Sequence, residues 1–261
     1  MLKQLMFISL SCIAFNIQAN EKKGSINKPD GLSIGIGAVG QSGLYLGEKT
    51  EVTPIPVIAY EGEHFFVRGL YAGMQFYRDE NITVNGIVSA NMMHLDVDKL
   101  SDSKLKEKNI DKSQLEDRDR SVDLGMETLM KLPYGVLSMQ ALQDIGAASK
   151  GTEIKVNYQY FWRLHPQFTL IPNVGFDWLS NKRANYYYGI LDEEVARGIT
   201  AYQPNQLIIP HLSLGARYRI NPRFDITGVA VYKFLPNKIE DGPLVDQKSL
   251  TNFFMAVTYK F

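Results

Sequence analysis

The pattern that most constrains this chain is a period-two alternation of apolar and polar side chains, repeated in segments of about ten residues. Such alternation is typical of β-strands with one apolar and one polar face. A soluble β-sandwich alternates too, but strands of this length with aromatic residues near their ends favour a transmembrane β-barrel. One segment places Ile154, Val156, Tyr158, Tyr160 and Trp162 on one face and Lys155, Asn157, Gln159 and Arg163 on the other.

About twelve strands account for the alternating segments. We expect them at residues 32–40, 52–60, 64–69, 71–77, 82–94, 121–131, 134–145, 151–163, 167–179, 208–220, 223–234 and 250–261. Short connections rich in turn residues then lie at one end of the sheet. Long connections lie at the other end, at 41–51, 95–120, 180–207 and 235–249. This asymmetry is typical of outer-membrane barrels. The predicted fold is therefore all-β, a single transmembrane antiparallel β-barrel over residues 20–261.

The segment 64–77 decides the strand count. Two strands there would each be shorter than the roughly nine to eleven residues that a tilted span needs. A single strand would give about eleven in total, which puts the chain ends on opposite sides and moves the later long loops to the periplasm. We therefore predict two short strands and about twelve in all; about ten is the alternative.

Residues 1–19 have the features of a secretory signal peptide. Lys3 supplies a positive charge, Leu5 to Phe15 form an apolar run, and Ala19 precedes the expected cleavage site. The run is shorter than the roughly twenty apolar residues of a transmembrane helix. Cys12 is the single cysteine of the chain, and it would leave with this segment. The remainder then has no thiol for a disulfide or a metal site.

The sequence offers little for catalysis, metal binding or nucleic-acid binding. The formal net charge is zero, which gives no basic surface for nucleic acid. The histidines lack the spacing of a metal-binding motif. His211 and Ser213 share a strand face, as the base and hydroxyl of a lipid-hydrolysing barrel would. That face continues into Arg217 and Arg219, which belong in the lumen because a charge facing lipid near the midplane costs roughly 2–4 kcal/mol. We therefore expect no enzymatic activity, no cofactor and no metal.

Charged residues on the polar strand faces are expected to line the interior of the barrel. Because their signs are mixed, they can pair across the lumen and close it, or they can leave a hydrated path; the sequence allows both. The predicted lumen-lining residues are Arg68, Asp123, Glu127, Lys155, Arg163, Asp177, Arg217, Arg219, Asp225 and Lys233.

The last predicted strand ends in an aromatic residue on its apolar face. A final strand of this kind resembles the recognition signal that bacterial barrel-assembly machinery reads on outer-membrane proteins. The residues that carry this resemblance are Phe253, Val257, Tyr259 and Phe261. We therefore expect the assembly machinery and the lipid of the outer membrane to be partners of this chain.

Residues 96–120 are dense in charge of both signs and almost free of aromatic residues. We expect such a composition to be unable to bury a core, so the sequence predicts a mobile surface loop.

Several stretches resemble the MipA/OmpV family of outer-membrane proteins, which is named after an MltA-interacting protein. The resemblance spans essentially the whole chain after the signal segment, and its motifs follow in the family's order. They are Gly35 to Ala38, Pro54 to Gly62 with Phe65 and Phe66, Asn185 to Ile190 with Glu193 to Ala196, Asp241 to Val245, and Asn252 to Phe261. Gly242 stands where the family has Ser, and the charged 96–120 segment matches no motif of the family.

The resemblance implies a non-enzymatic scaffold. The member that gave the family its name is proposed to link a lytic murein transglycosylase with a penicillin-binding protein during peptidoglycan growth. The family has no catalytic motif that could be matched to residues of this chain. Two alternatives stay open on the residues alone: a channel for small solutes, which the charged lumen suggests, and a surface adhesin that uses the loops 95–120 and 180–207.

Overall fold

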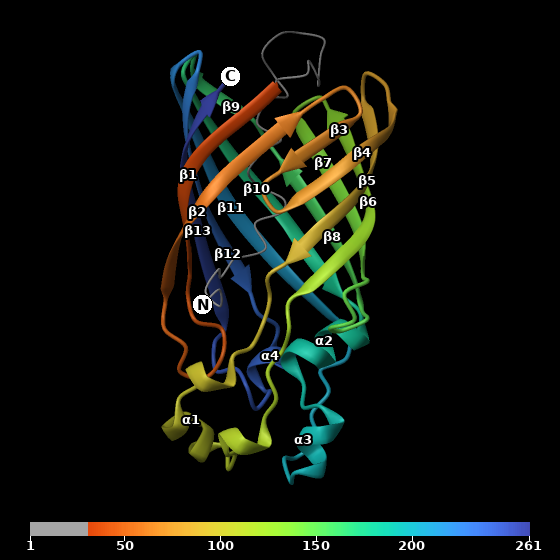
Figure 1. The fold of residues 1–261 in the computed structure, drawn as a ribbon, viewed down its shortest axis with the longest axis vertical. Helices are drawn as coiled ribbons and strands as arrows, with labels where there is room; N and C mark the ends of the chain where they lie inside the picture. Colours follow the sequence, from red (N-terminus) through yellow and green to blue (C-terminus); the bar gives the residue numbers. More distant parts are fainter. Residues whose placement is uncertain (1–30) are drawn as a thin grey trace.

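The computed structural model describes residues 31–261, so the predicted signal peptide at 1–19 lies outside the described residues. Their strands form one closed antiparallel sheet, in which β1 pairs with β13 and β10 with β11 (Figure 1). The strands are β1 (Gly31–Gln41), β2 (Glu51–Glu61), β3 (Phe65–Arg68), β4 (Tyr71–Arg78), β5 (Ile82–Asn91), β6 (Ser121–Leu132), β7 (Gly135–Asp144), β8 (Thr152–Gln159), β9 (Trp162–His165), β10 (Phe168–Leu179), β11 (Leu207–Asn221), β12 (Phe224–Phe234) and β13 (Ser249–Lys260).

The predicted strand at 151–163 is interrupted, because β8 and β9 pair one after the other with the same neighbour, β10. The backbone N–H of Tyr160 donates to the carbonyl of Pro172 on β10, 3.0 Å away. Pro172 has no N–H to return the bond, so the ladder is broken at this point. β8 and β9 therefore count as one crossing, and the predicted barrel of twelve strands is confirmed, whereas the alternative of ten is wrong.

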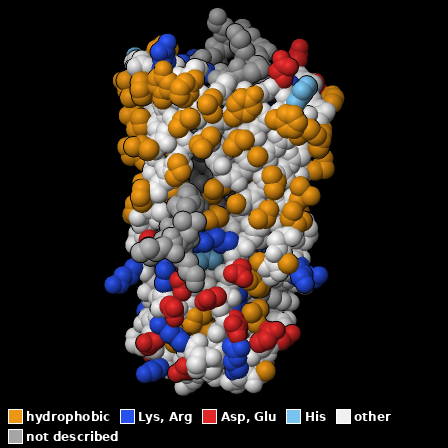
Figure 2. All heavy atoms as spheres, viewed as in Figure 1, with side chains coloured by type: hydrophobic (Ala, Val, Ile, Leu, Met, Phe, Trp, Pro, Cys, Tyr) orange, Lys and Arg blue, Asp and Glu red, His pale blue; other side chains and the backbone are white. Residues whose placement is uncertain are grey.

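Alternating burial gives the barrel an apolar exterior. In β11 every second residue from Leu207 to Gly215 is buried and the intervening ones are exposed. Exposed positions on most strands carry large apolar side chains, and on the face drawn in Figure 2 these side chains form a band over the upper part of the molecule. This band is the surface that the hydrocarbon of a bilayer covers. Within residues 31–261, no helix is long and apolar enough to cross a membrane.

The hairpin of β3 and β4 confirms the prediction of two short strands at 64–77. Gly69 turns the chain at φ 62°, a left-handed conformation that glycine adopts without strain. Its N–H donates to the carbonyl of Ile58 on β2, and the carbonyl of Leu70 accepts from Ala90 on β5. The hairpin therefore runs along β5 up to Ala90 but contacts β2 only from Ile58 to Glu61, at the short-turn end of the barrel.

The long loops fold together over the other end of the barrel. They contain the helices α1 (Asp102–Glu107), α2 (Asn181–Tyr188), α3 (Asp192–Ala196) and α4 (Asn237–Glu240), which Figure 1 shows below the strands. A core drawn from all of these loops includes Leu44, Leu95, Tyr187, Ile239 and Val245. We call this assembly of loops the cap.

The prediction of a mobile, coreless loop at 96–120 is wrong. The segment forms two 3-10 turns, Val97–Lys99 and Lys112–Gln114, on either side of α1. Its few apolar residues enter the core of the cap: Leu100, Leu105, Ile110 and Leu115 are all buried. They recur at every fifth position, so the charged residues between them occupy the solvent face of the cap. The average composition obscured this regular spacing.

Candidate functional site

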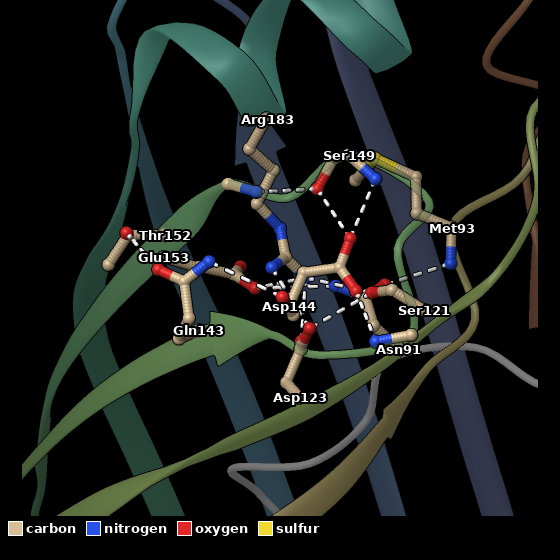
Figure 3. Close-up of polar contacts among 12 residues, drawn as sticks. Asn91, Met93, Ser121, Asp123, Gln143, Asp144, Ser149, Thr152, Glu153 and Arg183 are labelled. Carbon is tan, nitrogen blue, oxygen red and sulfur yellow. Dashed lines mark hydrogen bonds and ion pairs between the residues drawn. The ribbon is translucent and has the colours of Figure 1, made fainter.

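An arginine from the cap reaches into the end of the barrel and binds two carboxylates of the wall (Figure 3). Arg183 on α2 lies 2.7 Å from Asp123 on β6 and 3.2 Å from Glu153 on β8. Its side chain is almost fully buried, and so are both carboxylates. Burial alone would lower the pKa of Arg183, but Glu153 and Asp123 raise it above its ordinary value. Arg183 therefore stays charged and fixes α2 to the barrel wall.

Neighbouring polar groups complete this network. Asn91 at the end of β5 donates to Glu153 at 3.3 Å, and Ser121 donates to Asp123 at 3.0 Å. Lys155 lies 3.5 Å from Glu153. Each carboxylate thus receives more than one partner, as a charge in a dry environment requires.

A second network occupies the middle of the lumen around Glu127. The amides of Asn85 and Gln140 each donate to one oxygen of this carboxylate at 2.8 Å. Arg68 lies 3.5 Å from Glu127 and also binds Glu61, and its guanidinium stacks 4.1 Å above the ring of Phe66. These contacts hold the short β3–β4 hairpin against β2 and β6.

Two further ion pairs cross the lumen face of β10, β11 and β12. Lys233 donates to Asp177 at 2.6 Å, and Arg217 binds Asp225 at 2.5 Å. Arg219 lies 3.7 Å from Asp225. The remaining predicted lumen residue, Arg163, pairs in register with Thr169 on β10, but its side chain is exposed at the short-turn rim.

The interior is not polar throughout. On β1, β2, β12 and β13 the inward-facing residues form an apolar cluster: Val39, Val57, Val229, Val231, Phe254 and Ala256, with Ile55 packed against it. The sequence carried a sign of this cluster, because Phe254 and Ala256 make the last strand apolar on both faces. Part of the lumen wall is therefore apolar, and most of the charges lie on β5 to β11, with Arg68 on β3 and Asp225 and Lys233 on β12.

A cavity lies between the end of the lumen and the cap, with a space of about 810 Å³ that includes part of the open solvent. Apolar side chains such as Leu44, Met93 and Leu250 line it, together with the charged residues Asp177 and Lys233. Apolar and charged parts of the lumen wall thus both contribute to this cavity, which makes it a candidate binding site.

The cap itself is held by a fully buried ion pair. Arg118 lies 2.7 Å from Glu194 on α3, and neither side chain is exposed to solvent. Arg118 also donates to the carbonyl of Tyr186, while Glu194 accepts from the backbone of Leu191 at the start of α3. The carboxylate run 192–194, which sequence analysis placed in a loop, therefore contains a structural group.

His211 and Ser213 hydrogen-bond to asparagines of the lumen. His211 lies 2.9 Å from the side-chain oxygen of Asn157, and Ser213 accepts from Asn173 at 3.1 Å. Both residues are buried on the inward face of β11. Across residues 31–261, no cluster of His, Cys, Asp or Glu could hold a metal ion.

Sequence analysis missed the loop residues and the neutral partners. Arg183 and Arg118 lie in loops outside the alternating strand segments, and their partners are 60 and 76 positions away. No local pattern indicates such contacts. Asn85 and Gln140, by contrast, stand on the polar faces of predicted strands, but they are uncharged and were not among the predicted lumen-lining residues.

Comparison with known proteins identifies the relatives of this barrel. The profile of the family described as "MltA-interacting protein MipA" matches residues 34–261, which is most of the chain. The chain belongs to the MipA family.

Several relatives in this family align over nearly their whole length. The MltA-interacting protein of Escherichia coli strain K12 is 26% identical over 97% of this chain and 99% of its own. The outer membrane protein OmpV of Vibrio cholerae is 28% identical over 100% of both chains. Among solved structures, the NanC porin aligns with a TM-score of 0.46 and 8% identity over 87% of this chain and 100% of that one. This chain is an outer-membrane β-barrel, as its relatives are named.

The stretches that resemble the MipA family build parts of the cap and of three neighbouring strands of the wall, β13, β1 and β2. Asn185 to Ile190 cover the end of α2, where Tyr187 and Tyr188 are buried. Gly189 ends this helix, and a side chain there would meet the carbonyl oxygen of Asn185 at 2.6 Å. Leu244 and Val245 are buried in the cap, and Pro54 to Gly62 form most of β2. The family motifs thus mark the packing of the loops and the wall segment formed by β13, β1 and β2.

Proposed function

We propose that this chain is a non-enzymatic scaffold that binds a lytic murein transglycosylase at the periplasmic rim of the barrel. The observation that carries the proposal is family membership, together with the relative named MltA-interacting protein, which aligns over 99% of its own length. A penicillin-binding protein would be the second enzyme of the assembly, so that hydrolysis and synthesis of peptidoglycan occur side by side.

The geometry favours the short-turn rim as the docking surface. Short turns of outer-membrane barrels face the periplasm, where murein enzymes work. At this rim the large side chains of Tyr134 and Phe261 are 76% and 72% exposed. Aromatic side chains of this kind serve as anchors in protein interfaces. Charged rim residues, among them Glu80 and Arg223, provide a polar border.

Features of the long-loop end and of the lumen count against an adhesin and against an open channel. The apolar residues of the long loops are buried in the core of the cap, and Arg118 is buried rather than presented at the surface. The charged groups of the lumen bind one another, as Lys233 does Asp177. His211 and Ser213 hydrogen-bond to asparagines, which favours a structural role for these two residues over a catalytic one.

The test is binding of a purified soluble lytic transglycosylase to the folded barrel in lipid nanodiscs. We expect saturable binding by the natural chain and weakened binding by the rim variant Tyr134→Ala with Glu80→Lys. The control is Lys108→Ala, an exposed position of the cap at the opposite end. Equal binding by all three proteins would contradict docking at the rim, and no binding by any would contradict the proposed function.

A further inference from the structure

The barrel wall is incomplete between β2 and β5. β3 pairs with β2 only at Ala59, Tyr60 and Glu61, and the hairpin closes with the bond from Gly69 to Ile58. Among residues 31–261, positions 51–57 of β2 have no sheet partner on this side. At about 3.3 Å per residue, this unpaired edge is roughly 20 Å long.

Two prolines keep this edge open. In an antiparallel strand the N–H and C=O of one residue point to the same side. The carbonyl of Ile58 points to the hairpin, so the ring nitrogens of Pro56 and Pro54 point into the opening beyond it. Proline has no N–H to donate, and a further strand cannot pair with such an edge. The edge offers two carbonyl oxygens instead, so it is rich in acceptors.

The opening lies within the apolar band of the barrel. Val52 and Ile58 on its edge are 56% and 48% exposed. Val52 pairs in register with Gly40 of β1, and Gly40 pairs in register with the outward-facing Phe253 of β13. On the inner side, Val57 belongs to the apolar part of the lumen wall. An alkyl chain that enters from the bilayer therefore meets apolar side chains outside and inside.

The cavity under the cap lies at the cap-side end of this opening, because Gln41, which pairs with Glu51 at the start of β2, lines it. Met92, Met93 and His94 continue β5 along the other edge, and all three line the cavity. Leu179, Ile209 and Leu235 extend the apolar lining inward.

Three carboxylates and an amide oxygen without a partner are among the polar groups of the cavity. The side-chain oxygen of Asn252, a residue only 5% exposed, has no hydrogen-bond partner. The carboxylates of Glu48, Glu153 and Asp177 also line the space, and the cation Lys233 is bound to Asp177. An anionic group would be repelled here, whereas a hydroxyl group can donate to these oxygens.

We propose that the opening between β2 and β5 admits an amphiphile from the membrane, with its alkyl chain against the apolar lining and its uncharged, hydroxyl-bearing head group on Asn252. Monoacylglycerols belong to this chemical class. The site is separate from the rim that docks a murein enzyme, so either proposal can fail alone.

Equilibrium binding of isotope-labelled 1-monolauroylglycerol to the refolded full chain in detergent micelles tests this proposal, with laurate as the anionic comparison. We expect saturable binding of the glyceride, and binding of laurate weaker by about tenfold or more because of the acidic lining. Asn252→Leu should weaken glyceride binding about fivefold, as the loss of one hydrogen bond implies. Met93→Trp, which fills the cavity, should abolish it.

The matched control is Val174→Trp, a lipid-facing position on β10 away from the opening. It should bind the glyceride as the natural chain does. Altered gel mobility on boiling verifies that each variant is folded before binding is measured. Unchanged glyceride binding by the folded Met93→Trp variant, or equal binding of laurate and glyceride, would overturn the proposal.

Discussion

Arg118 and Glu194, 76 positions apart in the sequence, form an ion pair from which solvent is fully excluded. Their nitrogen and oxygen atoms are 2.7 Å apart. The pair joins the 92–120 loop to α3. This ion pair therefore helps to fix the arrangement of both loops over the barrel, together with the apolar core of the cap.

Removal of one member of this pair should loosen the cap. Glu194→Leu leaves Arg118 charged in a dry environment, and the cost of such a change is about 3–5 kcal/mol. We expect faster hydrogen exchange of the backbone amides in 110–118 and 184–199, with the exchange of the strands unchanged. The double variant Arg118→Met with Glu194→Leu should recover most of the protection. Equal loss in the single and double variants would contradict this account of the pair.

The contact between Arg183 and the wall should stabilise the whole barrel. Arg183→Met leaves Asp123 and Glu153 without their shared cation, so the temperature at which the folded band disappears on a gel should fall. Lys182→Met, at the exposed neighbouring position, is the matched control and should have no effect. A folded band of Arg183→Met that survives to the temperature of the natural chain would show that this contact is dispensable.

The environment of His94 predicts a dependence of stability on pH. Burial, and then the positive charge of Arg120, lower the pKa of His94 from its ordinary value of 6.5. The folded state thus binds fewer protons at this site than the unfolded state does. The corresponding stability is present above pH 6.5 and is lost as the pH falls below it.

The His94 prediction is checked by the midpoint of thermal unfolding at about pH 7.5 and about pH 5. His94→Gln keeps a hydrogen-bonding side chain but cannot be protonated in this range. The decrease in midpoint between the two pH values should be smaller in this variant than in the natural chain. An identical decrease in both would assign the pH dependence to other groups.

The packed cap predicts a low conductance. The natural chain in a planar bilayer should give small or no current steps, because the cap covers the long-loop mouth and the lumen charges are paired. Replacement of 97–117 by a short Gly-Ser linker removes Leu100, Leu105, Ile110 and Leu115 from the core of the cap, and it should raise the conductance. Large currents from the natural chain would favour the channel alternative instead.

The terminal aromatic residue is predicted to serve assembly. Phe261→Ser should reduce the amount of folded barrel in the outer membrane, because Phe261 is the last outward-facing residue of the predicted assembly signal. Thr258→Ser, on the inward face of β13, is the control. Normal amounts of the folded Phe261→Ser variant would show that Phe261 is not part of the assembly signal.

Strand positions could be predicted from the sequence because lipid and lumen impose opposite demands on alternate residues. The alternation predicts that Lys233 faces the lumen. It does not predict the partner Asp177, because the two residues lie on β12 and β10 with β11 between them. The interruption at Tyr160 was missed, although Pro172 in a predicted neighbouring strand was a sign of it.

The cap could not be predicted in the same way. Its core is drawn from several loops that have no common period, and each loop alone is mainly polar. Leu105 is buried only because Leu46, Leu95 and the other loops surround it. The paired prolines Pro54 and Pro56 were noted as part of a family motif, but their place on an unpaired edge required the register of β2.

The most direct test of the scaffold account is in-cell photo-crosslinking from single positions of the full chain. A photoreactive residue at Tyr134 on the short-turn rim should crosslink to a lytic murein transglycosylase, and one at Lys108 on the cap should not. Crosslinks to the transglycosylase from the rim alone are the result that we predict. If the rim crosslinks only to barrel-assembly machinery or abundant porins, the central claim is contradicted.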